Sequence, residues 1–204
     1  MSLRVVVAIA VVAVAGLAYF AWNRSAERAP QATIESDGGN AGDGAGSMPT
    51  LEAPQDDPGI AWDTPRGWQT SGPQGVRLAT YTVPAQGGGE SPRCAVYFFG
   101  PGQGGGVDAN LQRWIGEFEN PGQHDLSTLQ ADGISISRVQ VRGTYLAHAM
   151  DAAGSGGKRP DWGLLGAIAE GPSGNLFFKL TGPAAAVDAA ARDFDAMLAS
   201  IHKH

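Results

Sequence analysis

The sequence predicts an α+β domain, built from one antiparallel sheet of about six strands and two helices in the order βββαβββα. Three observations lead to this fold class. Short runs of strand-forming residues are separated by turns rich in Gly and Pro, two segments carry apolar residues at helical spacing, and short turns between consecutive strands favour antiparallel pairing. We assign residues 59–204 to this domain.

The first half of the domain supplies three predicted strands and one helix. The strands cover residues 60–62, 76–83 and 93–99, and a glycine-rich loop at 100–106 leads into the helix. Apolar residues recur on one face of that helix, so we expect this face to cover the sheet. They are Val107, Leu111, Trp114, Ile115 and Phe118, and Trp114 is expected to lie in the core.

The next predicted strand begins at Ile134, where apolar and polar residues alternate. The alternation changes phase at Arg138, which predicts a bulge or bend at that residue. Residues 145–150 extend the strand, and residues 151–161 read as a polar loop.

A hairpin and a helix close the domain. Two apolar runs, at 164–169 and 176–180, flank a turn that contains Gly and Pro, a pattern typical of paired strands. Thr181-Gly182-Pro183 then opens an amphipathic helix that runs towards Ile201. We expect this hairpin and helix to form the nucleus of the fold.

Two short motifs carry a resemblance to a known family. They are the opening Trp62-Asp63-Thr64-Pro65-Arg66-Gly67-Trp68 and the closing Phe177-Phe178-Lys179-Leu180-Thr181-Gly182-Pro183. With the strand and helix order, they resemble the PsbP-like α/β/α sandwich, shared by the extrinsic photosystem II subunit and a Ran-binding nuclear import factor. The chain also resembles a group of uncharacterised, membrane-anchored or secreted bacterial proteins. The resemblance implies a protein-binding or assembly module, and it transfers no binding residue to this chain.

Residues 1–22 predict an N-terminal membrane anchor. No residue from Val5 to Trp22 is charged, a length that crosses the hydrocarbon core of a bilayer, and aromatic residues lie at one end. A cleaved secretory signal is the alternative, with Ala13-Val14-Ala15 as its cleavage site. Either interpretation places the domain in the periplasm or outside the cell, and we expect an N-in, C-out orientation for the anchored form.

Residues 23–58 predict a disordered linker, because they are rich in Gly, Ala, Pro and acidic residues and contain almost no large apolar side chain. The chain as a whole has a net charge of −6 and carries no basic stripe, which argues against nucleic acid as a partner. Its one cysteine, Cys94, excludes a disulfide framework within the chain.

The loop Gly100–Gly105 matches the pattern G-x-G-x-x-G between a strand and a helix. A dinucleotide site would also require a parallel βαβ unit and an acidic residue at the end of the next strand. The segment that begins at Ile134 provides neither, so we interpret the loop as a crossover and expect no cofactor.

The other potential nucleophiles and metal ligands lack the neighbouring groups that catalysis or metal binding requires. Cys94 lies in an apolar strand, which favours a buried structural thiol, and Ser173 lies in a hairpin turn. His124-Asp125 with His148 and Asp151 matches no zinc spacing, so we predict no metal site. The sequence therefore predicts no catalytic residue.

Three tryptophans at element edges, Trp62, Trp68 and Trp162, are the candidate partner-binding residues, because indole rings are enriched at interfaces. The resulting hypothesis is a membrane-tethered, extracytoplasmic, non-enzymatic protein-interaction or assembly module that binds an envelope protein. The alternative is a small-ligand binding protein or hydrolase with a site near His148, Asp151 and the Gly100–Gly106 loop.

Overall fold

The computed structural model describes residues 57–85, 89–122, 124–147 and 157–204. The expected anchor at 1–22, nearly all of the expected linker, His148 and Asp151 lie outside the described residues. Among the helices that the structure describes, none has both the length and the apolar character needed to cross a bilayer.

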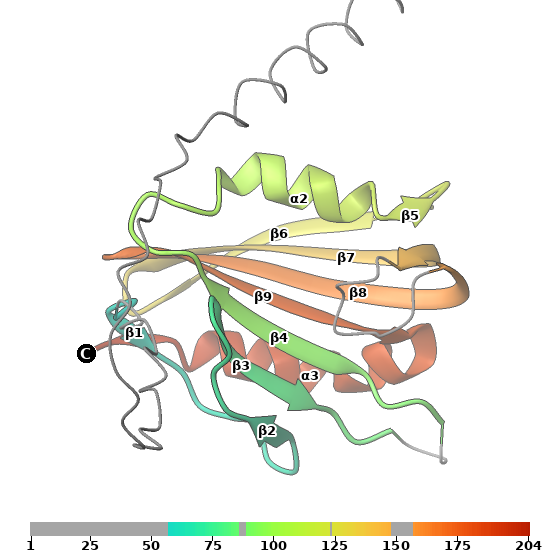
Figure 1. Cartoon of the computed structure of the whole chain (residues 1–204), viewed down its shortest axis with the longest axis horizontal. Coiled ribbons are helices and arrows are strands. Elements are labelled where there is room, and N and C mark those ends of the chain that lie inside the picture. Colours follow the sequence, from blue (N-terminus) through green and yellow to red (C-terminus); the bar gives the residue numbers. More distant parts are fainter. Residues whose placement is uncertain (1–56, 86–88, 123, 148–156) are drawn as a thin grey trace, which may run out of the picture. The chain divides into compact units, whose positions relative to one another are not determined.

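The elements follow in the order β1 (Ile60–Ala61), β2 (Gln69–Ser71), β3 (Arg77–Thr82), β4 (Arg93–Phe98), α2 (Val107–Ile115), β5 (Phe118–Glu119), β6 (His124–Ala131), β7 (Ile134–Ala147), β8 (Gly157–Gly171), β9 (Gly174–Pro183), α3 (Ala184–Ala199) and β10 (His202–Lys203). The α+β class is confirmed, with a large antiparallel sheet and two helices that lie on its opposite faces (Figure 1).

The sheet has eight strands, so the expectation of about six was wrong. Its order is β2-β3-β4-β9-β8-β7-β5, and β6 also pairs with β7. The strands that the sequence did not predict are short or polar: β2 and β5 have three and two residues, and β6 exposes most of its side chains at the sheet edge. Strands of this kind lack the apolar pattern on which the prediction depends.

The C-terminal residues add a separate two-stranded sheet, in which β10 pairs with β1. The neighbouring Asp57 carboxylate accepts a hydrogen bond from the Gly59 backbone N–H at 2.8 Å. That bond and His204 beside it hold the pKa of Asp57 below its usual value. The two ends of the domain therefore lie together.

The central strands are buried on both faces, which explains their continuous apolar sequence. On β8, Leu165, Ala167 and Ala169 belong to the core beneath α3, whereas Leu164 and Ile168 belong to the core beneath α2. The same alternation runs along β9 and β4. We therefore describe the sheet by its α3 face and its α2 face.

The expected bulge at Arg138 is absent, and β7 pairs with β8 in regular register at that residue. The change of phase has a different cause. Arg138 lies on the α3 face and donates to Asp195 of α3 at 2.8 Å, while Val139 and Val141 enter the core under α2. Each face thus has its own apolar stretch, and the register shift occurs later, between Gly143 and Tyr145.

The helix α2 is held close to the sheet because it lies over a glycine. Trp114 is buried and contacts the backbone of β8 at Gly166, where any Cβ would overlap its indole ring. As expected, Trp114 is a core residue. This helix has nine residues, against sixteen in α3, and packs against β7 and β8. It therefore leaves the α2 face of β4 and β9 partly uncovered.

We expect the substitution Gly166→Ala to lower the free energy of unfolding by about 2 kcal/mol, because the added methyl overlaps a buried ring that cannot move freely. Urea denaturation of the full chain measures this effect. Gly72→Ala is the control, since a Cβ at Gly72 meets nothing within 4 Å. Equal stability of the two variants would contradict the packing of α2 described above.

Candidate functional site

A groove opens on the α2 face of the sheet, beside α2 and over β4 and β9. Its volume is about 530 Å³, within the usual range of ligand pockets. The lining residues come from three parts of the chain: Tyr97 on β4 with Phe99 directly after the strand, Arg113, Trp114, Gly116 and Glu117 at the end of α2, and Phe177 and Lys179 on β9.

Aromatic rings form the apolar part of the groove. Tyr97 and Phe99 stack with their ring centroids 6.1 Å apart, and Phe99 meets Phe177 edge-on at 5.5 Å. Trp114 meets Phe177 edge-on at 6.5 Å. Phe99 is 42% exposed and is one of three large apolar residues at the surface of the described chain. The groove therefore offers an accessible aromatic surface.

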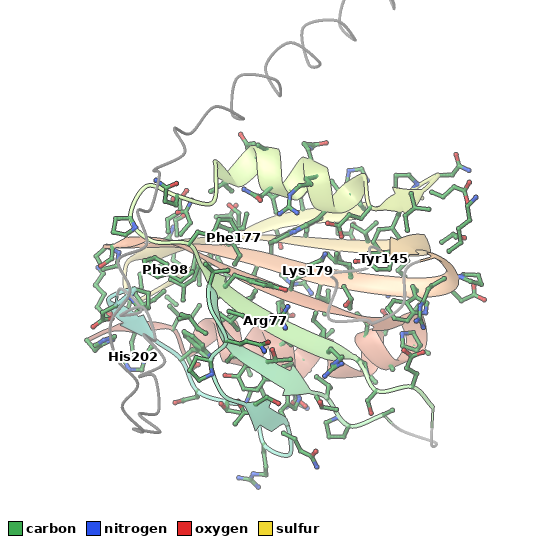
Figure 2. The ribbon with its side chains drawn as sticks, viewed as in Figure 1. Arg77, Phe98, Tyr145, Phe177, Lys179 and His202 are labelled. Atoms are coloured by element: carbon green, nitrogen blue, oxygen red, sulfur yellow. The ribbon has the colours of Figure 1, made fainter. Side chains whose placement is uncertain are left out.

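A buried ion pair lies beside these rings. Lys179 Nζ is 2.6 Å from Glu117 Oε2, and the two side chains are 12% and 8% exposed. The hydroxyl of Tyr145 donates to Glu117 Oε2 at 3.3 Å and accepts from Lys179 Nζ at 3.3 Å. Figure 2 shows Phe177, Lys179 and Tyr145 in succession across this face. The three polar groups thus satisfy one another in a site that water reaches poorly.

Arg113 is the accessible cation of the groove. Its side chain is 59% exposed, and its Nη1 is 3.7 Å from Glu117 Oε1. It also donates to Asn110 Oδ1 at 2.7 Å. Asn110 in turn donates to the carbonyl oxygens of Gly104 and Gly106, both at 2.9 Å. The start of α2, the glycine-rich loop and the groove are therefore connected by hydrogen bonds.

The glycine-rich loop packs on the aromatic rings. Gly104 has a φ of +85°, and a Cβ there would lie 2.7 Å from Phe177 and 2.9 Å from Phe99. Only glycine fits this conformation and this contact. The strands on either side of α2 belong to antiparallel pairs, not to a parallel βαβ unit, and Asp108 places a negative charge in the first helical turn. The loop thus shapes the groove and lacks the setting of a dinucleotide site.

A second arginine lies beside Tyr97 but is not itself a lining residue of the groove. Arg77 of β3 pairs with Tyr97 of β4, and its guanidinium lies 5.4 Å from the centroid of the Tyr97 ring. Its Nε atom is buried and has no hydrogen-bond partner. Buried donors are rarely left in this state, so the unpaired Nε of Arg77 is an unusual feature of the structure.

The other candidate residues lie away from the groove. Cys94 is fully buried on the α3 face, where burial raises the pKa of its thiol well above the usual value. His124 and Asp125 are exposed on β6, and three strands separate that strand from β4, which carries Cys94. Ser173 lies in the β8–β9 turn. Across the described ranges, no three His, Cys, Asp or Glu side chains gather as metal ligands.

The three tryptophans occupy separate places. Trp68 is buried against Tyr81, and the half-buried Trp62 donates its indole N–H to the Tyr81 hydroxyl at 3.0 Å. Trp162 is buried and stacks on Tyr145 with the centroids 5.6 Å apart. It therefore supports the polar network under the groove. None of the three lines the groove, and their role in partner binding stays a prediction.

One sequence signal could have located this site. Lys179 interrupts the apolar run Leu176–Leu180, in a strand predicted to lie at the centre of the sheet. A charged residue in such a strand requires a buried partner. Sequence reasoning missed the groove because Tyr97, Phe99 and Phe177 look like ordinary strand formers, and because nothing in the pattern pairs Glu117 with Lys179.

Comparisons with known proteins concern the fold. No family model and no curated protein matches the chain. Among solved structures, the chain is similar to the solution structure of cyanobacterial PsbP (CyanoP) from Synechocystis sp. PCC 6803. The TM-score is 0.46 and the identity 13%, over 78% of this chain and 99% of that chain. PsbP-like proteins are also the family that the sequence motifs resemble.

We expect Lys179→Met to lower the free energy of unfolding by about 3 kcal/mol, because it leaves the buried Glu117 carboxylate without its nearest cation. Lys158→Met is the matched control, since Lys158 pairs with Glu119 at 2.7 Å but both side chains are exposed. That change is expected to cost less than about 0.5 kcal/mol. Urea denaturation compares the two variants, and similar losses would show that the Glu117–Lys179 pair is not buried.

Proposed function

We propose that the protein is a membrane-tethered, extracytoplasmic interaction or assembly module that binds a segment of an envelope protein in the groove beside α2. The observation that carries this proposal is the exposed ring of Phe99, packed against the half-buried Tyr97 and the buried Phe177, in a groove bordered by charged residues. Aromatic side chains of this kind contribute a large share of the energy at protein interfaces.

The arrangement of the charged groups favours binding over catalysis. Glu117 is the only carboxylate among the residues that line the groove, and it is engaged by Lys179 at 2.6 Å and by the Tyr145 hydroxyl. A general base or nucleophile needs access to its substrate, which these contacts restrict. The thiol of Cys94 lies on the opposite face of the sheet. The groove therefore offers contact surface and fixed charge.

The proposed location rests on the N-terminal sequence. The uncharged segment Val5–Trp22 would hold the domain at the membrane, and residues 23–58 would act as its tether. A cleaved signal at the same place would release the domain into the same compartment. The groove could meet an envelope protein in either case.

A small-ligand binding protein is the second candidate function. The site proposed for it from the sequence includes the Gly100–Gly106 loop, which adjoins the groove. Gly104 packs directly against Phe99 and Phe177. The groove volume also suits a small molecule. A hydrolase would need His148 and Asp151, which lie outside the described residues.

Site-specific photocrosslinking in the native host tests the proposal. A benzophenone amino acid at Phe99 of the full chain is expected to give a discrete crosslinked protein species, because this ring is exposed in the groove. The control is the same amino acid at Ala189, which is exposed on α3. Tyr97→Ala should reduce the Phe99 crosslink severalfold without changing the protein level. Identical products from both positions, or none from Phe99, would contradict the proposal.

A further inference from the structure

Resting on the proposed function, we infer that the groove selects an acidic partner segment that carries an aromatic side chain. Two features of the groove point to this ligand class. The first is a cationic rim in a chain whose net charge is −6. The second is a set of aromatic rings close to that rim.

The cation at the mouth of the groove is Arg113. Its carboxylate neighbour, Glu117, lies 3.7 Å from Arg113 but only 2.6 Å from Lys179. Glu117 is therefore shared between two cations and neutralises Arg113 incompletely. Because the Arg113 side chain is 59% exposed, a second carboxylate can approach it from solvent.

The second cation is Arg77, which lies against the Tyr97 ring. Its buried Nε has no hydrogen-bond partner in the folded chain. The Arg77 guanidinium therefore acts at a distance: its positive charge beside Tyr97 favours an acidic segment in the groove without touching it. Tyr97 also lines the groove, so one ring separates this cation from the bound segment.

The apolar half of the site is provided by Phe99, Tyr97 and Phe177. Phe99 stacks on Tyr97 with an interplanar angle of only 4° and meets Phe177 edge-on. The exposed edge of this cluster favours an incoming aromatic ring, which gains both burial and ring contacts. The overall negative charge of the chain opposes an acidic ligand weakly, because salt screens charges beyond about 8 Å.

The test uses dye-labelled peptides and the purified full chain, with binding measured by fluorescence anisotropy. The first peptide has a phenylalanine between two pairs of glutamates. A second replaces the glutamates with lysines, and a third replaces the phenylalanine with alanine. The acidic aromatic peptide is expected to bind at least tenfold more tightly than either of the others.

Variants of the protein separate the contribution of the Arg113 charge from that of the Phe99 ring. Arg113→Gln should weaken binding of the acidic aromatic peptide about fivefold, the loss typical of one exposed charge pair. Phe99→Ala should weaken it at least tenfold. Arg192→Gln, at an exposed position on α3, is the control and should leave binding unchanged.

Equal or tighter binding of the basic peptide would overturn this inference, as would equal binding of the peptide without phenylalanine. Phenylacetate that binds as tightly as the acidic aromatic peptide would assign the groove to a small anion and would overturn it too. If the Phe99 crosslink persisted in any of these cases, the interaction function would stand and only the ligand class would fail.

Discussion

The attachment of α2 to the sheet is the constraint on which the site depends. Trp114 packs on the backbone of Gly166 in β8, and the Glu117–Lys179 ion pair joins the end of the helix to β9. The first contact is apolar and sets how closely the helix approaches. The second is polar and, with the Tyr145 hydroxyl, fixes where the chain leaves the helix. Removing either would free α2 to shift over the sheet.

This attachment explains why a groove exists at all. The α3 face is covered by a sixteen-residue helix and forms a continuous core. The α2 face is covered by nine residues placed over β7 and β8, so Phe99 is exposed and Tyr97 half-buried beside the helix, while the buried Phe177 of β9 still lines the groove. Burying an ion pair contributes little net stability. This pair instead fixes the position of α2, because it holds the end of the helix on β9. Arg113 stays exposed at the mouth of the groove.

The sequence was sufficient for the parts of the fold that combine strong periodicity with burial. The apolar part of the β8–β9 hairpin, α3 and the core position of Trp114 follow from apolar patterns that the structure reproduces. The expected polar loop at 151–161 was wrong in its described part, because β8 already begins at Gly157 and its polar first residues pair with β7. The pattern failed for β6, whose side chains face solvent at an edge, and for the very short β2 and β5. Around Arg138, the buried apolar side chains of β7 change from the α3 face (Ile134, Ile136) to the α2 face (Val139, Val141), and periodicity alone cannot distinguish this change from a bulge. The groove escaped prediction because its residues meet only through the tertiary fold: β4 and β9 are adjacent in the sheet but distant in sequence.

Hydrogen exchange tests the central claim most directly. In the full chain, Glu117→Gln removes the charge that joins α2 to β9 and preserves the size of the side chain. The account predicts that the backbone amides of α2 (Val107–Ile115) exchange at least tenfold faster in the variant, while those of α3 (Ala184–Ala199) keep their protection. Unchanged exchange in α2, or an equal increase in both helices, would contradict the claim that this ion pair holds the helix and the groove in place.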